Sequence, residues 1–296
     1  MRPYNQVVIF FALTQLLGIY TGIALIHSAM QIPEVREMSV APTGSPDDPL
    51  NAAFFIAYII FGAAMIILVA RFYKGAMLFR FLELAVITSA SAIVFFAIFL
   101  NVLGLDFEIA LLLGGLVGLA LGAAKFFFPQ IKNAAAIISS AGVGALFGFS
   151  LGFLPTAIFI IGLSAYDYIA VFKTRHMVEM ARELSTRQLS FAVTAKNIPQ
   201  KKPKEKQVEY IERVKTEGER LDLGTGDLSV PAMISVSAYS LGPNGIIYSF
   251  AAAIGATVSL YFLLKFVSRQ KVFLPALPPI CLGSMLALLI AKLLYP

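Results

Sequence analysis

Long apolar segments recur along the whole chain and limit its fold more than any other feature. A helix needs about 20 apolar residues to cross the hydrocarbon core of a bilayer. Nine segments approach this length, at 6–29, 52–70, 81–103, 109–124, 134–153, 156–172, 221–241, 246–265 and 273–294. Only 14% of the residues are charged, whereas a soluble domain carries roughly 25%. The sequence therefore predicts an all-α, multi-pass protein of the cell membrane with nine transmembrane helices.

Basic residues gather in alternate loops and predict the orientation of the chain. The second, fourth, sixth and eighth loops carry Lys and Arg, for example Arg80, Lys125 and Lys271, whereas the first and third carry mainly Asp and Glu. Because cytoplasmic loops are enriched in Lys and Arg, the even loops and the N-terminus are expected in the cytoplasm. Nine crossings then leave the C-terminus outside the cell. The net charge of +6 follows from this topology, so it does not indicate nucleic-acid binding.

The sixth loop is the one long polar region, and it divides the chain into parts. It contains the basic run 201–206 and a mixed acidic and basic run that ends at Arg220. This composition predicts a partly disordered cytoplasmic loop over 173–220. We expect an N-terminal part, 1–172, with helices one to six, and a C-terminal part, 221–296, with helices seven to nine. The first segment, 6–29, is too long for the apolar region of a signal peptide and is expected to remain as a helix.

Two carboxylates lie well inside the apolar segments, away from their first residues. Asp167 lies in the sixth segment and Asp227 in the seventh. An Asp at the centre of a membrane helix costs about 2.5–3.5 kcal/mol on insertion scales, so it calls for a functional explanation. Lys173 and Arg220 mark the nearby cytoplasmic boundary, and the rise of a helix places both carboxylates roughly 10 Å below it. Since the two helices are consecutive and antiparallel, the carboxylates are expected to face each other.

A close pair of carboxylates in an apolar site favours acid–base hydrolysis. Both groups cannot ionise together in a low dielectric, so they share one proton. The ionised group can take a proton from water while the protonated group polarises a peptide carbonyl, without a metal or cofactor. His27 and His176 are expected on opposite sides of the membrane, which argues against a zinc site or a serine–histidine mechanism. Cys281 is the only cysteine, so no disulfide forms within the chain.

Unusual backbone composition occurs near both carboxylates. Gly224 and Gly226 lack a Cβ and allow another backbone to approach Asp227. The prolines that follow Lys271 remove backbone N–H donors and prevent regular helical hydrogen bonding at the start of the last helix. Irregular backbone at this depth is tolerated only where it is buried in protein or lines a wet cavity. A helical substrate that is unwound for hydrolysis would also need hydrogen-bond partners for its freed backbone groups. Pairing of the extended substrate with exposed main chain of the protein would supply them.

Other polar residues in the apolar segments are interpreted more simply. Gln15 and Asn101 are predicted to form hydrogen bonds between helices. Glu83 is predicted to be paired or to reach the membrane boundary. The pattern Gly114 to Gly118 predicts close packing between helices.

Three short motifs resemble those of a known family. Tyr166-Asp167, Gly224-Thr225-Gly226-Asp227 and Pro275-Ala276-Leu277 are similar to the YD, GxGD and PAL motifs of presenilins and signal peptide peptidases, which are intramembrane aspartyl proteases. The resemblance implies cleavage of peptide bonds within transmembrane helices of membrane proteins, with Asp167 and Asp227 as the catalytic pair. It also implies that the remaining motif residues, Tyr166, Gly224, Thr225, Gly226, Pro275, Ala276 and Leu277, shape the active site and bind substrate.

The expected orientation resembles that of presenilin and is the reverse of that of signal peptide peptidase. This orientation favours substrates whose N-terminus is outside. Thr225 stands between the glycines where presenilins usually have an apolar residue, a departure that bears on fine substrate preference and not on the chemistry. The sixth loop lacks a long apolar segment, so activity is expected from one uncut chain. The compact loops resemble those of an archaeal homologue that works without accessory subunits. Expected partners are membrane-protein substrates and lipids, and the sequence leaves a homo-oligomer open.

Two alternatives use similar residues. An ion- or proton-coupled transporter, or a cation leak channel, would also place paired carboxylates and broken helices inside the membrane. Such transporters often contain an inverted repeat, and no second copy of the Asp-bearing segments is evident here. A prepilin or preflagellin peptidase also uses a GxGD aspartate. Those proteins have fewer spans and lack the Pro-Ala-Leu element.

Overall fold

The computed structural model describes residues 3–72, 76–172, 192–196, 220–270 and 275–296. Within these ranges a helix overlaps each of the nine predicted segments. The helices are α1 (Pro3–Gln31), α3 (Leu50–Phe72), α4 (Ala76–Asn101), α5 (Phe107–Phe127), α6 (Lys132–Ser150), α7 (Phe153–Phe172), α10 (Thr225–Ser237), α11 (Gly245–Gln270) and α12 (Leu277–Leu294), with short helices α2 (Pro33–Glu37), η1 (Pro129–Ile131) and η2 (Ala238–Leu241) between them. Six helical stretches among the described residues are long and apolar enough to cross a membrane.

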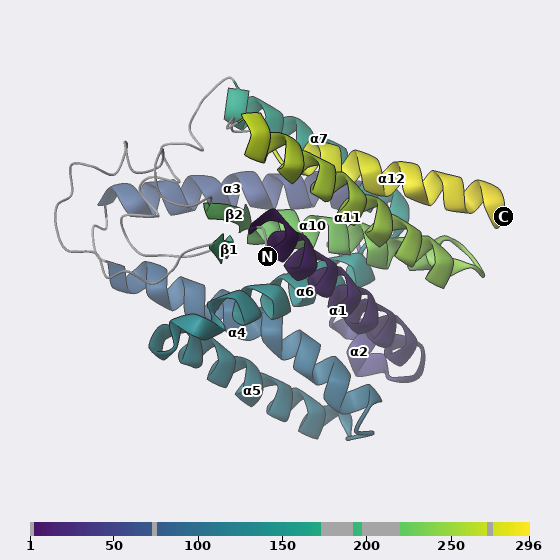
Figure 1. Cartoon of the computed structure of the whole chain (residues 1–296). Coiled ribbons are helices and arrows are strands. Elements are labelled where there is room, and N and C mark those ends of the chain that lie inside the picture. Colours follow the sequence, from purple (N-terminus) through teal and green to yellow (C-terminus); the bar gives the residue numbers. More distant parts are fainter. Residues whose placement is uncertain (1–2, 73–75, 173–191, 197–219, 271–274) are drawn as a thin grey trace.

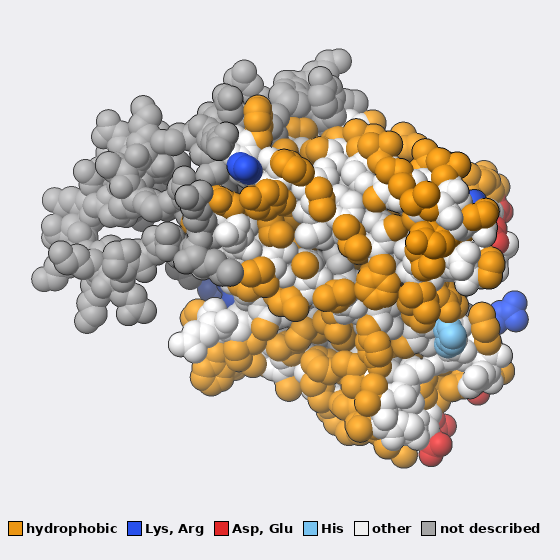
Figure 2. All heavy atoms as spheres, turned by 45° about the vertical axis from the view of Figure 1, so that its right-hand side comes forward, with side chains coloured by type: hydrophobic (Ala, Val, Ile, Leu, Met, Phe, Trp, Pro, Cys, Tyr) orange, Lys and Arg blue, Asp and Glu red, His pale blue; other side chains and the backbone are white. Residues whose placement is uncertain are grey.

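The outer surface of the bundle is apolar. Large side chains such as Phe61, Leu112 and Leu282 are more than half exposed. Figure 2 shows one face covered mostly by hydrophobic side chains, with charged groups near its edges. Such a surface suits lipid, because in a bilayer every backbone polar group must be satisfied inside the protein and helices achieve this. The fold is therefore that of a helical membrane protein, as predicted.

Helix α10 lies at the centre of the bundle and is contacted by α1, α6, α7, α11 and α12 (Figure 1). Its residues from Leu228 to Ser237 are all buried. Glycines on α1 and α6 bring these neighbours close: a Cβ on Gly22 would lie 2.3 Å from Val236 Cγ1, and one on Gly144 would lie 2.7 Å from the carbonyl oxygen of Ser229. Small residues at these contacts let helix backbones approach closely.

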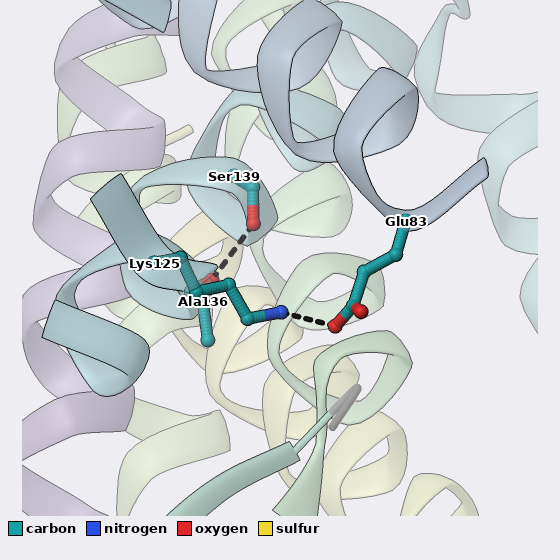
Figure 3. A network of polar contacts seen from close by, with 4 residues as sticks. All are labelled: Glu83, Lys125, Ala136 and Ser139. Carbon is teal, nitrogen blue, oxygen red and sulfur yellow. Dashed lines mark hydrogen bonds and ion pairs between the residues drawn. The ribbon is translucent and has the colours of Figure 1, made fainter. Parts of the chain in front are cut away.

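Helices α4 and α5 form a tightly packed hairpin. A Cβ on Gly118 would lie 2.6 Å from the carbonyl oxygen of Thr88, and one on Gly114 would lie 2.8 Å from the backbone nitrogen of Phe96. The predicted role of this glycine pair is confirmed. Near the start of α4, the Lys125 ammonium of α5 forms a buried ion pair with Glu83 (Figure 3). Glu83 is thus a paired residue of the bundle interior.

The prediction of one continuous helix over 221–241 was wrong at its N-terminal end. Residues Arg220–Gly224 form strand β2, which pairs antiparallel with strand β1 (Ala192–Lys196), so that Ala192 lies opposite Gly224. The prediction of an all-α fold was wrong for these residues too. Gly224 and Gly226 are poor helix formers, and β1 satisfies the backbone groups that a helix would otherwise pair. The two paired strands lie at the start of α10 (Figure 1).

The last predicted segment also begins later than expected. Helix α12 starts at Leu277, with Ala276 as its N-cap residue. Pro275 precedes them and is buried, while residues 273 and 274 lie outside the described part of the chain. The Pro-Ala-Leu segment therefore forms the entry to the helix, as the prolines indicated.

Candidate active site

Asp227 is held by the start of its own helix. It is the third residue of α10, and Gly224 is the N-cap residue, with φ −63° and ψ 148°. The Asp227 carboxylate accepts a hydrogen bond from the Gly224 backbone N–H. An acidic side chain that reaches back from this position satisfies one of the free amides at a helix start, and the helix dipole favours its negative charge. The local sequence therefore offsets part of the cost of placing a carboxylate here.

Asp167 is held by the start of a different helix. It lies on α7, and only 6% of its surface is exposed. Its carboxylate accepts a hydrogen bond from the backbone N–H of Leu277, the first residue of α12. The first four amides of a helix have no partner within it, so they are available to a neighbouring anion. The Pro-Ala-Leu segment thus places a main-chain donor against this carboxylate.

The two carboxylates share one site. Helix α7 contacts both α10 and α12, and the two charges are near enough to act on each other. Cys281 of α12 is buried beside them: its thiol is hydrogen-bonded to the Ser164 side chain and lies within the field of both carboxylates. The structure therefore brings Asp167 and Asp227 together, as expected for consecutive antiparallel helices, and places Leu277 of α12 beside Asp167.

Tyr166 lies beside a groove between α3 and α7. Its side chain is 52% exposed, and the other lining groups are almost all apolar. The groove is formed by Ile56, Ile59, Ile60 and Ala63 of α3 and by Phe159, Gly162, Leu163 and Tyr166 of α7. The groove therefore leads from the apolar surface of the bundle to Tyr166, the residue before Asp167.

The glycines beside Asp227 have different surroundings. A Cβ on Gly224 would lie 3.3 Å from Asp227 Oδ2, tighter than ordinary contact. Gly226 is exposed, and a Cβ there would meet nothing within 4 Å. Thr225, between them, is partly buried and begins α10. Among the described residues, Gly224 supports the carboxylate directly, whereas Gly226 faces open space.

Sequence reasoning missed the place of Cys281 in the site. Cys281 was considered only for a disulfide, although it follows Leu277 by four positions and so shares its helix face. Gln15 was predicted to bond between helices, and its amide indeed donates to the Leu228 carbonyl oxygen at 3.2 Å, next to Asp227. Asn101 also bonds between helices, because Ser28 Oγ donates to its Oδ1 at 3.1 Å. No group of three or more His, Cys, Asp and Glu suited to a metal occurs among the described residues.

Comparison with known proteins gives the family. Residues 8–295 match the family described as signal-peptide peptidase, presenilin aspartyl protease. The chain belongs to this family. It is therefore an aspartic endopeptidase of the membrane, and the transporter and prepilin-peptidase alternatives are not favoured.

The fold is also similar to solved structures of the family. In one crystal form of a presenilin-family intramembrane aspartate protease, the TM-score is 0.66 at 22% identity, over 99% of both chains. In a second crystal form it is 0.60 at 22% identity, over 95% of this chain and 96% of that one. A comparison with curated protein sequences gave no match. The structural likeness shows the common fold, which includes the carboxylate-bearing helices α7 and α10.

Proposed function

We propose that Asp167 and Asp227 are the catalytic pair with which this intramembrane protease hydrolyses peptide bonds in transmembrane helices of membrane proteins. One observation carries the proposal. The two carboxylates come from neighbouring helices to one site, and each accepts a backbone N–H at the start of a helix. Both groups belong to one chain, so a single copy supplies the whole pair.

The pair performs hydrolysis as a general acid and a general base. The ionised carboxylate takes a proton from a water molecule, whose oxygen attacks the peptide carbon. The protonated carboxylic acid gives its proton to the carbonyl oxygen, so a tetrahedral diol forms without a covalent bond to the enzyme. The diol then collapses: the C–N bond breaks, the leaving nitrogen receives a proton, and a new carboxylic acid and amine result. Each aspartate returns to its starting state through these proton transfers.

The surroundings of the pair suit a helical substrate that must be unwound. The groove between α3 and α7 is apolar and leads to Tyr166. Strand β2 pairs on one edge with β1, and among the described residues no strand pairs with its other edge, where we infer that an extended segment of the substrate adds. Such pairing satisfies the backbone groups that a substrate exposes when its helix opens. The open space at Gly226 lets that backbone approach Asp227.

The same proposal includes the topology of the chain. Nine crossings with the N-terminus in the cytoplasm place the two paired strands and both carboxylates toward the cytoplasmic side. The C-terminus lies at the opposite end of the bundle from β1 and β2 (Figure 1), which supports an extracellular C-terminus. The short α10 fits this arrangement because the strand and η2 continue it at either end. The orientation favours substrates whose N-terminus is outside.

The test replaces each aspartate with its uncharged isostere. In purified protein, Asp167→Asn and Asp227→Asn should each lower the cleavage rate of a single-span test substrate by about 10²–10⁴-fold, the usual contribution of a general acid or base. Mass spectrometry of the products measures the loss. Thermal unfolding in the same detergent serves as the control and should not fall, because Asn removes a buried charge. Hydrolysis retained by the double variant would refute the assignment.

A further inference from the structure

A buried amide lies next to the segment that carries Asp227. Gln15 is in the middle of α1 and is only 1% exposed. Its Nε2 donates to the Leu228 carbonyl oxygen at 3.2 Å, and its Oε1 accepts from Ser235 Oγ at 3.3 Å. A backbone oxygen can only accept, so the atom facing Leu228 must be the amide nitrogen. An apolar side chain would pack as well here, so the amide calls for an explanation.

Helix α10 is interrupted between these two contacts. Pro231 lies inside it. Proline lacks the N–H that would donate to the carbonyl four residues earlier, which here belongs to Asp227, and its ring crowds that carbonyl. The first turn of α10 is therefore joined to the rest of the helix by one hydrogen bond fewer than usual. Without outside support, that turn and its carboxylate would be free to tilt.

Gln15 bridges this interruption. One end of its amide holds Leu228, on the Asp227 side of Pro231, and the other end holds Ser235, beyond it. Ser235 is itself tied to the break, because its single hydroxyl hydrogen is shared between Gln15 Oε1 and the Pro231 carbonyl oxygen, which lies 3.0 Å away. A single side chain from another helix therefore links both halves of α10.

The contact between α1 and α10 is close enough to fix this bridge. Gly18 and Gly22 lie on the same face of α1 as Gln15, three and seven residues further on. A Cβ on Gly18 would lie 3.1 Å from the Ala232 Cβ, and one on Gly22 would clash with Val236. The backbones are thus in near contact, so the amide has little freedom to move away.

We propose that Gln15 is a positioning residue, which sets the angle of the first turn of α10 and so holds Asp227 against Asp167. It acts through the carbonyl of Leu228 and does not touch the reacting groups. The proposal rests on the catalytic assignment of the two aspartates. It assigns α1 a part in catalysis that the motifs around the carboxylates do not reveal.

The experiment compares Gln15→Leu with Thr14→Val, both purified in detergent and assayed on one single-span substrate. Leu keeps the volume and removes both contacts with α10. Thr14 is equally buried on α1, but its hydroxyl bonds to the Phe10 carbonyl oxygen of its own helix at 2.9 Å. Gln15→Leu should lower kcat about tenfold or more, because small misplacements of catalytic groups are costly. Its KM should stay within about twofold, and Thr14→Val should keep both constants.

A rescue separates positioning from general stability. Pro231→Ala restores the missing N–H within α10, so kcat should fall much less when Gln15→Leu is added to Pro231→Ala than when it is added to the wild type. If Gln15→Leu does not fold, Ser235→Ala, which removes one end of the bridge, should still lower kcat about threefold or more. A role in stability alone predicts a lower unfolding temperature with unchanged kcat per folded molecule.

The outcomes are distinct. Unchanged kcat in Gln15→Leu, or in Ser235→Ala where that variant replaces it, would overturn the positioning role. The positioning role would also be overturned if Gln15→Leu lowered kcat by the same factor in the Pro231→Ala background as in the wild type. Asp227→Asn, run in parallel, tests the catalytic assignment. If it is inactive, these results bear on Gln15 alone, and if it cleaves at the wild-type rate, both proposals are wrong.

Discussion

At the scale of single residues, main-chain amides explain how two acids can occupy an apolar bundle. A carboxylate in lipid is costly unless it finds partners. Here the N–H of Gly224 serves Asp227 and the N–H of Leu277 serves Asp167. Both donors belong to helix starts, where amides are free and the dipole is positive. These bonds leave each carboxylate with further lone pairs for water or substrate.

Gly224→Ala tests this support for Asp227. The backbone angles of Gly224 suit any residue, so alanine can occupy the position, but its Cβ would lie 3.3 Å from Oδ2 and push the carboxylate aside. We expect kcat to fall about tenfold, while stability stays equal or rises slightly because alanine restricts the unfolded chain. Steady-state kinetics and thermal unfolding measure the two effects. Wild-type kcat in this variant would contradict the proposed contact.

Residue types predicted the acids of the site but not their partners. Asp167 and Asp227 stand out because apolar segments rarely contain carboxylates. Gly224 and Leu277 donate through the backbone N–H, a group that every residue except proline has. The sequence therefore cannot mark these two residues as donors. Gln15 was visible as a polar residue in an apolar helix. Its position beside Leu228 depends on packing between distant segments, which the sequence pattern does not contain.

At the scale of elements, apolar length predicted where helices occur better than where they begin. The segment 221–241 is apolar throughout, yet its first residues form β2. A short apolar run does not distinguish a strand from a helix by periodicity, and the pairing partner at Ala192–Lys196 lies far away in sequence. The glycines of α5 were more informative, because Gly114 and Gly118 share one face and their closeness to α4 follows from helix geometry.

The ion pair between α4 and α5 leads to a prediction about stability. The Glu83 and Lys125 side chains are 4% and 8% exposed. Glu83→Gln removes the carboxylate charge that faces the Lys125 ammonium in the interior, so it should lower the free energy of unfolding by up to about 3–5 kcal/mol. Replacing both partners, as Glu83→Leu with Lys125→Met, should recover most of that loss. Unfolding of the detergent-solubilised protein measures both, and equal losses in single and double variants would contradict the argument.

At the scale of the whole molecule, the charge pattern predicts one orientation, and the fold is compatible with it. Successive membrane-length helices run in alternate directions through the bundle, and the two strands lie at the opposite end from the C-terminus (Figure 1). In the predicted topology the basic loops lie on the cytoplasmic side. In the proposed function, the orientation decides whether substrates have their N-terminus outside the cell or in the cytoplasm. It is therefore a functional property as well as a structural one.

Cysteine labelling can test the orientation directly, because Cys281 is buried and is the only cysteine of the chain. In a Cys281→Ser background, single cysteines at the exposed positions Ser45, Pro296 and Phe128 report on the first loop, the C-terminus and the fourth loop. A membrane-impermeant maleimide added to intact cells should label Ser45→Cys and Pro296→Cys. Phe128→Cys should react only after the membrane is permeabilised, since Lys125 and Lys132 on either side of it favour the cytoplasm. The reverse pattern would place both termini on the other sides of the membrane and favour substrates with a cytoplasmic N-terminus.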